Sequence, residues 1–253
     1  MGPKQKVSLI VPCYNSGSYI YRNLQEVVRT LHKFGIDHEI IVVDDGSTDN
    51  TFEEAKEAEN GNLKVVGYTE NKGKGYALKY GVRFATGDFI TFADADLDIH
   101  PNQLMTLIRY MEENNADIVI GSKRHKDSKV DYPLKRRILS YVYHLFVAAL
   151  FRLKIKDTQG GFKLLKRQCA DKILPKVLIK KFAFDLELLV VAKKFGFKIV
   201  EAPIEVKQLF KSSSVGAGTI KNMLQDTLAV AYRLYLLKWY DEDHIIPKVL
   251  EKK

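Results

Sequence analysis

Cysteine is scarce in this chain, and proline and glycine are not abundant. The 253 residues include two cysteines, Cys13 and Cys169, with seven prolines and 16 glycines. Two cysteines cannot build a disulfide framework or supply the four ligands of a structural zinc site. The glycine and proline content excludes fibrous and low-complexity chains. Because 46% of the residues are hydrophobic, a globular protein with a sizeable core is expected.

A long hydrophobic run is also missing. The longest central stretch without Lys, Arg, Asp or Glu covers 14 residues, 138–151. A membrane-spanning helix needs about 20 apolar residues, so no span is predicted. The polar start of the chain leads into a short apolar strand and not into the helical core of a signal peptide. With so few cysteines, these features predict a reducing, intracellular compartment.

Positive charge is in excess. Forty Lys and Arg residues stand against 31 Asp and Glu residues, which gives a formal net charge of +9. Such a balance favours anionic partners, namely nucleotides, phosphates, acidic lipids or nucleic acid. Many intracellular proteins are equally basic without a specific anionic partner, so charge alone leaves both interpretations open.

The first half of the chain alternates between two kinds of pattern. Apolar, β-branched runs predict strands at 7–11, 39–43, 63–68, 88–93 and 117–120. Helical periodicity predicts helices at 19–34, 49–58, 76–85 and 101–113. Strict alternation indicates right-handed βαβ units, a mostly parallel sheet and a three-layer α/β/α sandwich.

The second half departs from this alternation. Helices are predicted at 134–153, 167–173, 184–195 and 219–240, and strands at 162–165 and 198–206. The helix at 134–153 is apolar with basic ends, and the one at 219–240 is amphipathic. We expect a catalytic domain at 1–211, a loop and amphipathic interface helix at 212–240, and a charged tail at 241–253.

Polar and glycine-rich segments follow each of the first five strands. In open α/β sheets, ligands bind at the carboxyl ends of the strands, so these segments are expected to meet at one site. They read PCYN at 12–15, DDGS at 44–47, NKGKG at 71–75, DAD at 94–96 and GSKR at 121–124.

The sharpest of these segments is Asp94-Ala95-Asp96. Two carboxylates one residue apart at a strand end can face one hard cation, and Mg²⁺ or Mn²⁺ keeps open positions for phosphate oxygens. Asp98 is close enough in sequence to join them. The alternative is a solvated acidic turn. Because the pair follows the apolar strand at 89–92, unpaired carboxylates would be costly there, and we favour the metal site.

Asp44-Asp45 has two interpretations: a cap for the next helix, or a carboxylate that accepts hydrogen bonds from a nucleobase or ribose. Ser47 or Asp49 already supplies a cap. The first strand is not followed by GxGxxG, and the chain has no GxxxxGK[ST], which disfavours a dinucleotide fold and excludes a P-loop NTPase.

These motifs together resemble the family 2 glycosyltransferases of GT-A fold. The resemblance rests on VPCYN, VVDDGS, NKGKG and FADAD at 11–15, 42–47, 71–75 and 92–96. GSK, DTQGGFK and FAFDLEL at 121–123, 157–163 and 182–188 resemble the polyprenyl-phosphate members, the dolichyl-phosphate mannose synthases and glucosyltransferases. The residues of the last two motifs favour the glucosyltransferases over the mannose synthases.

The resemblance implies a role for each matching position. Pro12, Tyr14 and Asn15 would frame the base, and Asp44 would bind the base or its ribose. The remaining nucleotide-binding positions would be Asp45, Lys74, Asp94 and Ala95. Asp94 and Asp96 would also hold a metal that bridges the diphosphate of UDP-glucose or GDP-mannose.

Three positions depart from the usual pattern of the mannose synthases. Ser16 stands in place of a Glu, which removes one expected base contact. Asp98 stands in place of a Gln and would add a third metal ligand. Lys123 replaces an Arg, and a lysine does not offer bidentate phosphate contacts, so Arg124 is expected to share its role.

The expected reaction is the inverting transfer of a hexose from a nucleotide sugar to a polyprenyl phosphate. The leaving diphosphate would be stabilised by the metal, Lys123, Arg124 and a mobile Lys207 or Lys211. The Ser/Gly-rich loop at 212–218 is either a lid over the site or a plain connector.

A lipid phosphate has a second pKa of about 6 and is already an anion at neutral pH, so no general base is obligatory. It must be steered instead, and Arg136 and Arg137 are candidates for this task. The alternative is that these arginines extend along a helix surface. Four other polar residues are expected to orient cations, the sugar or the acceptor: Asp157, Gln159, Asp185 and Glu187.

The uncharged run at 138–151 lies within a segment, 119–156, that holds ten basic and two acidic residues. An apolar helix with cationic ends suits the surface of an anionic membrane, as does the aromatic-rich helix at 219–240. The alternative is that both helices only dock on the catalytic core. We expect a cytoplasmic enzyme, peripheral on the inner face of a membrane, that binds no nucleic acid; the oligomeric state is left open.

Two other functions remain. One is a family 2 enzyme that acts on a soluble or polysaccharide acceptor, for which a general base would be required. The other is a basic module, without enzymatic activity, that binds membranes or nucleic acid. Asp44, Asp94 and Asp96 would repel phosphates in the absence of a metal, so the last function ranks lowest.

Overall fold

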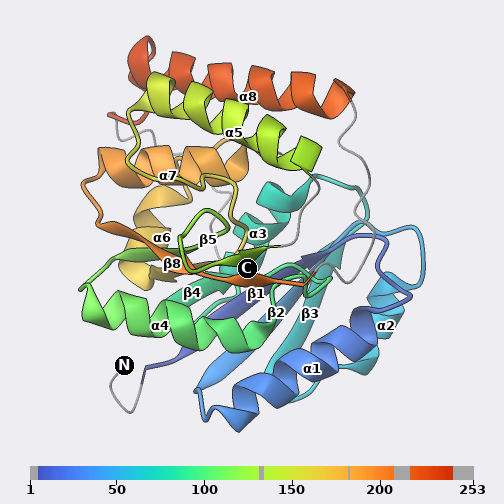
Figure 1. Cartoon of the computed structure of the whole chain (residues 1–253). Helices are drawn as coiled ribbons and strands as arrows, with labels where there is room; N and C mark the ends of the chain where they lie inside the picture. Colours follow the sequence, from blue (N-terminus) through green and yellow to red (C-terminus); the bar gives the residue numbers. More distant parts are fainter. Residues whose placement is uncertain (1–4, 131–133, 182, 208–216, 242–253) are drawn as a thin grey trace.

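The structure is a computed structural model of the chain, and it describes residues 5–130, 134–181, 183–207 and 217–241 (Figure 1). It does not describe the side chains of residues 134–139. Consequently Lys211, the loop at 212–216, most of the tail at 241–253 and the side chains of Arg136 and Arg137 lie outside the described part. The predicted domain boundary at 211 also falls there and stays a prediction.

A seven-stranded sheet forms the centre of the molecule, in the order β3-β2-β1-β4-β7-β5-β8. Its strands are β1 (Val7–Cys13), β2 (His38–Asp45), β3 (Leu63–Tyr68), β4 (Phe89–Phe92), β5 (Ile118–Ser122), β7 (Lys163–Lys166) and β8 (Ile199–Pro203). Every neighbouring pair is parallel except the two pairs that involve β7. The predicted mostly parallel sheet is confirmed.

Strand β7 runs antiparallel between β4 and β5. Its first residue, Lys163, pairs with Phe92 at the end of β4 and with Ile120 in β5. Because an antiparallel strand begins where its parallel neighbours end, the residues that precede Lys163 lie beside the carboxyl ends of β4 and β5. This placement brings Gly160 and Gly161 to the edge of the sheet where ligands are expected.

Helices cover both faces of the sheet, as the alternating pattern predicts (Figure 1). On one face are α1 (Ile20–Lys33), α2 (Thr51–Glu57) and α4 (Leu104–Glu113), the last preceded by the 3₁₀ helix η1 (Pro101–Gln103). On the other are α3 (Lys74–Val82), α6 (Arg167–Ile173) and α7 (Phe184–Lys194). Alternate strand side chains divide between the two cores: Leu9 and Val11 join one, and Ile10 joins the other.

Two more helices, α5 (Leu134–Phe151) and α8 (Ala217–Tyr235), lie beyond α7 at one end of the molecule (Figure 1). They contact each other, and the Tyr143 and Thr227 hydroxyls form a hydrogen bond of 2.9 Å between them. Their inner residues Val147 and Val230 are fully buried. Both helices therefore dock on the core through one face. None of the described helices combines the length and apolar character needed to cross a bilayer.

Two predicted elements differ in extent. The strand expected at 198–206 divides at Pro203, which ends β8; β9 (Glu205–Val206) then pairs with β6 (Lys129–Val130) in a separate two-stranded sheet. Proline has no N–H to donate, so it suits a strand end. The last helix stops at Tyr235 instead of residue 240, and Lys238 takes a left-handed φ of 51° that does not continue a helix.

Candidate active site at the carboxyl edge of the sheet

An ion pair between Lys74 and Asp94 lies at the centre of the site. Asp94 follows the buried strand β4, and Lys74 begins α3 after the glycine turn at Gly73. Their side chains are 39% and 42% exposed, so solvent and ligands can reach the pair. The structure thus joins the third and fourth of the polar segments that the sequence predicts to converge.

The two charges stabilise each other. Removal from solvent works to raise the pKa of Asp94, but the charge and hydrogen bond of Lys74, helped by Lys123 and Lys163, hold that pKa below its ordinary value. Removal from solvent also favours neutral Lys74, but the carboxylates of Asp94 and Asp185 outweigh it and raise the Lys74 pKa. Three strand-end segments, together with Lys163 and Asp185, therefore contribute charges that act on one another.

Asp96 is the less compensated carboxylate. Burial and the neighbouring Asp94 raise the pKa of Asp96 to about 6. Its Oδ1 accepts the backbone N–H of Asp98 at 3.2 Å, which bends the loop back on itself. Two neighbouring carboxylates that repel each other provide a suitable oxygen donor set for Mg²⁺ or Mn²⁺.

Asp98 does not complete a three-carboxylate set. Among the described residues, no three His, Cys, Asp or Glu side chains are grouped so that they could hold a metal ion. The role of Asp98 as a third metal ligand stays a prediction. A cation held by Asp94 and Asp96 would keep its remaining positions for substrate oxygens and water.

The loop that carries Asp94 and Asp96 is anchored from the opposite face of the sheet. Asn23 in α1 donates to the backbone oxygen of Ala95 at 2.8 Å, and the Ala95 side chain is buried. Leu97 takes a left-handed φ of 57°, which reverses the chain after Asp96. Ala95, predicted as a nucleotide contact, instead holds the two carboxylates in place through its backbone.

Asp45 organises the glycine loop at 71–75. Its carboxylate accepts the Tyr68 hydroxyl at 2.6 Å, the backbone N–H of Lys72 at 2.8 Å, and the backbone N–H of Gly73 at 2.9 Å. The Asn71 amide also donates to it, at 3.1 Å. These donors occupy Asp45, so the prediction that it binds the nucleotide directly is corrected: Asp45 shapes the turn that delivers Lys74.

Asp44 belongs to a second cluster, at the ends of β1 and β2. It accepts the backbone N–H of Ser47 at 3.2 Å and also its hydroxyl. Asn15, with a left-handed φ of 48°, receives the N–H of Thr48 on its side-chain oxygen at 2.9 Å. Tyr14 is 46% exposed beside them. The loops are thereby joined, and an aromatic ring at their edge is available for a base.

Pro12 lies within β1 and pairs with Val43 in β2, and its side chain is partly exposed. It precedes Tyr14 by two residues, and because β1 ends at Cys13, Tyr14 lies in the bend that follows the strand. Nothing tests the predicted contacts of Pro12, Tyr14, Asn15 or Asp44 with a nucleotide, and they stay predictions.

The second half of the chain closes the site through Gly161. A Cβ added at this glycine would be 2.9 Å from Asp94 Oδ2 and 3.0 Å from Lys74 Nζ. A side chain there would shift the end of one of the two charged side chains, so glycine permits this close approach without moving either. Gly160 is similarly confined, because an added Cβ would be 2.6 Å from the backbone oxygen of Gly121.

A buried lysine lies behind this contact. Lys163 has no exposed side-chain area; its amino group bonds to the backbone oxygen of Gly160 and forms an ion pair with Asp185. Asp185 stands at the start of α7, where a negative charge is favoured by the helix dipole. Asp185 thus pairs with Lys163 in the structure, and its predicted role toward the sugar or the acceptor stays a prediction.

Lys123 and Arg124 follow β5. The backbone N–H of Lys123 donates to Asp157 at 2.9 Å, and Asp157 also receives the N–H of Gln159 at 3.1 Å. The positive charge of Lys123 contributes to the low pKa of Asp94, which places it within reach of the same site. Arg124 turns toward α5 and donates to Ser140 at 2.8 Å. Of these two residues, Lys123 is therefore the one whose positive charge acts on Asp94, and Arg124 contacts α5 instead.

Gln159 lies at the contact between this loop and α5, since its amide is 3.5 Å from the Tyr143 hydroxyl. The roles predicted for Gln159 and Asp157 toward sugar or acceptor stay predictions. In the structure, Asp157 accepts the backbone N–H groups of Lys123 and Gln159 and so fixes the backbone at both residues.

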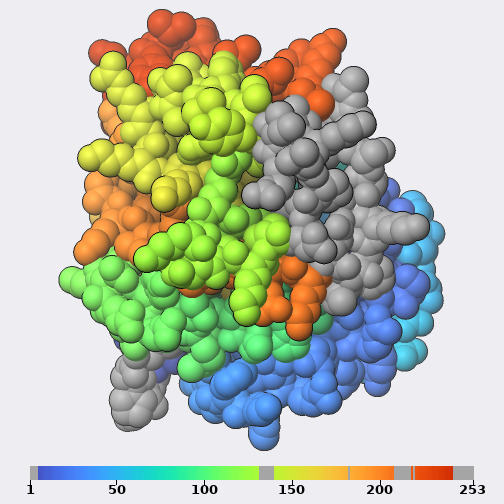
Figure 2. Space-filling view, in the orientation of Figure 1, coloured from blue at the N-terminus to red at the C-terminus, as the bar shows by residue number. Residues whose placement is uncertain are grey.

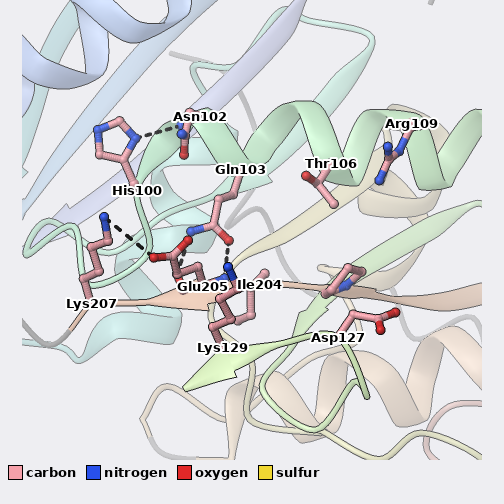
Figure 3. Close-up of a pocket in the computed structure, with 11 residues that line it drawn as sticks. His100, Asn102, Gln103, Thr106, Arg109, Asp127, Lys129, Ile204, Glu205 and Lys207 are labelled. Carbon is pink, nitrogen blue, oxygen red and sulfur yellow. Dashed lines mark hydrogen bonds and ion pairs between the residues drawn. The ribbon is translucent and has the colours of Figure 1, made fainter. Parts of the chain in front are cut away.

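Lys207 belongs to a different hollow, shown in Figure 3. This hollow of about 410 Å³ is formed by η1, α4, β9 and the loop around Asp127. The Lys207 amino group is 3.7 Å from Glu205 in it, although its backbone N–H bonds to the Asp98 oxygen at 2.8 Å. The structure thus brings the Lys207 backbone, but not its amino group, to the carboxylate loop.

Glu187 is a structural residue and not a ligand for sugar or acceptor. It is fully buried and accepts the backbone N–H groups of Leu178 at 2.8 Å and Ile179 at 2.7 Å. Arg233 of α8 donates to it at 2.8 Å, and the Tyr240 hydroxyl at 2.6 Å. The expected role in substrate orientation is corrected, because these donors occupy the carboxylate.

The segment that Glu187 holds also seals the glycine loop. The Gly75 N–H donates to the Lys180 backbone oxygen at 2.8 Å, and an added Cβ on Gly73 would be 2.7 Å from that oxygen. Gly73 has a φ of 93°, a conformation that favours glycine. The sequence analysis identified neither the contact of the glycine loop with the Lys180 backbone nor the role of Lys163. The only indication was that Gly73, Gly75 and Lys163 lie inside motifs that were quoted for other residues.

Comparison with known proteins agrees with this geometry. Residues 8–174 match Glycosyl transferase family 2. The chain is 30% identical to a dolichyl-phosphate beta-glucosyltransferase of Dictyostelium discoideum over 92% of this chain and 76% of that protein. It is 29% identical to the dolichyl-phosphate beta-glucosyltransferase of Homo sapiens, with 94% and 78% covered.

Solved structures show the same fold. Glucosyl-3-phosphoglycerate synthase from Mycobacterium tuberculosis, in complex with Mn²⁺, uridine diphosphate and phosphoglyceric acid, superposes with a TM-score of 0.68. The two share 20% sequence identity, over 90% of this chain and 78% of that one. The same enzyme with Mg²⁺ and uridine diphosphate gives a TM-score of 0.68 at 19% identity. This chain belongs to glycosyl transferase family 2.

Proposed function

We propose that this protein transfers glucose from UDP-glucose to dolichyl phosphate, with inversion at the sugar carbon and with Mg²⁺ or Mn²⁺ as cofactor. The observation that carries the proposal is the cleft of Asp94, Asp96, Lys74 and Lys123 at the carboxyl edge of the sheet. The choice of glucose over mannose is supported by the relatives named dolichyl-phosphate beta-glucosyltransferase.

Asp94 and Asp96 would hold the cation, and when bound it would neutralise the charge that develops on the leaving diphosphate. Lys74 keeps Asp94 ionised and oriented, and Lys123 adds a positive charge beside it. Gly161 lets the loop before β7 lie against these groups, which excludes water from that side. The chain thus supplies a fixed electrostatic environment, the largest contribution in many enzymes.

The acceptor needs no general base in this proposal, because a phosphate monoester is an anion at neutral pH. It needs positive charge along its path. Lys123 and Arg124 lie on the side of the cleft that faces α5, and Arg136 and Arg137 belong to the first turn of that helix. We assign the acceptor phosphate to this side.

The surface that would meet the membrane is formed by α5 and α8, and Figure 2 shows the side chains of α8 at one extremity with those of α5 beneath them. Large apolar side chains stay exposed there. In α5 they are Tyr141, Val142 and Leu145, at 54%, 58% and 49% exposure. In α8 they are Leu228, Tyr232 and Tyr235, at 54%, 51% and 52%. We call this the α5/α8 face; such a surface with interfacial tyrosines suits a peripheral membrane protein.

The deciding experiment incubates purified protein with Mg²⁺ or Mn²⁺, one of two donors, UDP-glucose or GDP-mannose, and a short polyprenyl phosphate, and determines the product by mass. We expect a glucosyl polyprenyl phosphate from UDP-glucose and little product from GDP-mannose. 3-Phosphoglycerate serves as a control acceptor, because the structural neighbour is crystallised with phosphoglyceric acid. Transfer to 3-phosphoglycerate alone, or from GDP-mannose alone, would refute the proposal.

A further inference from the structure

A second hollow, of about 430 Å³, lies between the glycine loop, the segment before α7, and α8. Its walls are Lys72, Leu178, Ile179, Lys180, Lys181, Asn222, Gln225, Asp226, Ala229 and Arg233. The donor cleft has no residue in this list. We call this space the lysine hollow.

Three lysines make the hollow positively charged. The Lys72 amino group lies 5.1 Å from the centre of the Tyr76 ring, and that of Lys180 lies 5.7 Å from the same centre. Lys181 lines the wall next to them. Within the described residues, none of these three amino groups forms an ion pair with a carboxylate. Two of these positive charges lie over one tyrosine and the third lines the same wall, and like charges this close repel one another unless an anion joins them.

The other charged residues of the wall do not cancel this excess. Arg233 is already engaged by buried Glu187 at 2.8 Å. Asp226 is the single carboxylate in the wall; it is partly buried, accepts the backbone N–H of Ala183, and lies within the field of Lys181 and Arg233. Three lysines therefore face one carboxylate that already has partners. The hollow is complementary to an anion.

Helix α8 connects the hollow to the α5/α8 face. Asn222, Asp226, Ala229 and Arg233 recur every three or four residues and form one row along the helix, with Gln225 beside Asp226. The exposed row of Leu224, Leu228, Tyr232 and Tyr235 lies about a third of a turn away. A helix that rests on a membrane by the second row holds the first row at the level of the lipid headgroups.

We propose that the lysine hollow binds the phosphate headgroup of an anionic membrane lipid. The proposal rests on the membrane-surface part of the proposed function. It is separate from the donor and acceptor sites, because Lys72 turns to Tyr68 and Tyr76 while its neighbour Lys74 turns to Asp94. The bound lipid is not consumed; it would hold the enzyme at the surface where its acceptor lies.

A charge-adding variant tests the site without disturbing the fold. Asn222→Asp with Gln225→Glu places two negative charges in the wall, on exposed side chains of nearly unchanged shape. The matched control is Gln25→Glu with Asn62→Asp, which makes the same chemical change at exposed positions outside the hollow. Both variants lower the net charge equally, so a difference between them reports on position.

Binding is measured by co-sedimentation with vesicles of phosphatidylcholine, alone or mixed with phosphatidylserine. We expect wild type to prefer the mixed vesicles. Charges near an anionic surface each change binding about fivefold, so the Asn222→Asp, Gln225→Glu variant should bind the mixed vesicles about 25-fold more weakly. The control should lose much less. Equal losses in the two variants would overturn the proposal, because they would indicate diffuse charge only.

Two further measurements distinguish a lipid-headgroup site from a site for a free phosphate, and the headgroup proposal from the proposed reaction. Titration of the wild type with glycerol phosphate in solution should give no saturable binding. If the wild type binds glycerol phosphate tightly and the Asn222→Asp, Gln225→Glu variant does not, the hollow is a site for a free phosphate and the lipid proposal is overturned. Glucosyl transfer to a short polyprenyl phosphate without vesicles should be unchanged in that variant. If wild type shows no such transfer, the proposed reaction fails while the sedimentation result still decides the headgroup site.

Discussion

At the scale of single residues, the donor cleft depends on which carboxylates are left for a metal. Asp94 is paired with Lys74. Asp45 and Glu187 are occupied by hydrogen-bond donors of the chain itself. Asp96 is the carboxylate whose pKa is raised, by burial and by Asp94. Similar side chains therefore have different tasks because their partners differ. This distribution yields the first two predictions.

The first prediction concerns Asp96. Asp96→Asn removes one of the two charges that would hold the cation, and we expect kcat/KM for glucosyl transfer to fall about 10³-fold with the fold unchanged. Asp98→Asn is the matched control, because Asp98 does not join the carboxylate group, and it should lose little activity. Steady-state kinetics at several Mn²⁺ concentrations measures both. Equal losses would show that the cation is held differently.

The second prediction concerns Gly161. Gly161→Ala places a methyl group 2.9 Å from Asp94 Oδ2, so the carboxylate or Lys74 must move. Displacement of a positioned charge by a fraction of an ångström lowers kcat, here by about 10²-fold. Gly61→Ala is the control, since an added Cβ there meets nothing within 4 Å. Kinetics and thermal unfolding are compared, and unchanged kcat in Gly161→Ala would contradict this account of the loop.

At the scale of elements, two buried carboxylates hold segments together that are distant in sequence. Glu39 in β2 accepts the Ser8 hydroxyl at 2.5 Å, the Lys6 amino group at 3.0 Å and the backbone N–H of Thr86 at 2.5 Å. Glu187 in α7 holds α8 and the segment before α7. One carboxylate secures the amino edge of the sheet, and the other secures the outer helices.

The third prediction is a pH dependence of stability. Burial works to raise the pKa of Glu39, but hydrogen bonds from Ser8, Thr86 and Lys6 outweigh it and lower the pKa from 4.5 to about 2. A lowered folded-state pKa stabilises the fold above pH 4.5, and this contribution, about 3 kcal/mol, is lost as pH falls toward 2.

We therefore expect the stability difference between wild type and Glu39→Gln to shrink by that amount between pH 6 and pH 2. Urea unfolding at a series of pH values measures it. Glu57→Gln, on the exposed side of α2, is the control and should show no such trend. A difference for Glu39→Gln that does not change with pH would contradict the lowered pKa.

The fourth prediction concerns Glu187. Glu187→Gln removes the charge that faces buried Arg233, and the loss of one partner of a buried ion pair costs about 3 kcal/mol. We expect a lower urea midpoint, and protease cleavage near α8 at lower urea than in wild type. Glu53→Gln, at an exposed position, should change neither. If Glu187→Gln unfolds at the wild-type midpoint, the network does not hold α8.

The elements themselves were largely predictable, and the reason is physical. Apolar runs at strand period and amphipathic runs at helical period depend on neighbours in sequence, so the strand at Leu63–Tyr68 and the helix at Arg167–Ile173 have the predicted bounds. The antiparallel placement of β7 was not predicted, because strand direction depends on which edges are free. Lys163 and Glu187 could not be placed because their charged partners, Asp185 and Arg233, are distant in sequence.

At the scale of the whole molecule, the net charge of +9 and the exposed α5/α8 face act together. Charge attracts the protein to an anionic surface over about 10 Å at physiological salt, and the apolar side chains act only on contact. The convergence of strand-end segments into one cleft could be predicted from the sequence because parallel strands end at the same edge.

The fifth prediction belongs to this scale. Transfer to a long-chain polyprenyl phosphate in vesicles should rise when anionic lipid is added and fall as salt is raised, because screening weakens attraction to the surface. Transfer to a short acceptor in solution should respond much less. Radiolabelled glucose incorporation at several salt concentrations compares the two. Parallel salt curves would indicate that salt acts on the donor cleft instead.

The insertion of β7 has a consequence for synthesis of the chain. β4 and β5 do not pair with each other; each pairs with β7, whose residues follow them by at least 41 positions, from Ser122 to Lys163. A nascent chain that has emerged only as far as β5 therefore leaves one edge of β4 and both edges of β5 unpaired, because β8 also follows later, and unpaired edges are sites of aggregation. Translation must continue past Lys166 before the sheet is continuous, so fragments that end earlier should need chaperones to stay in solution.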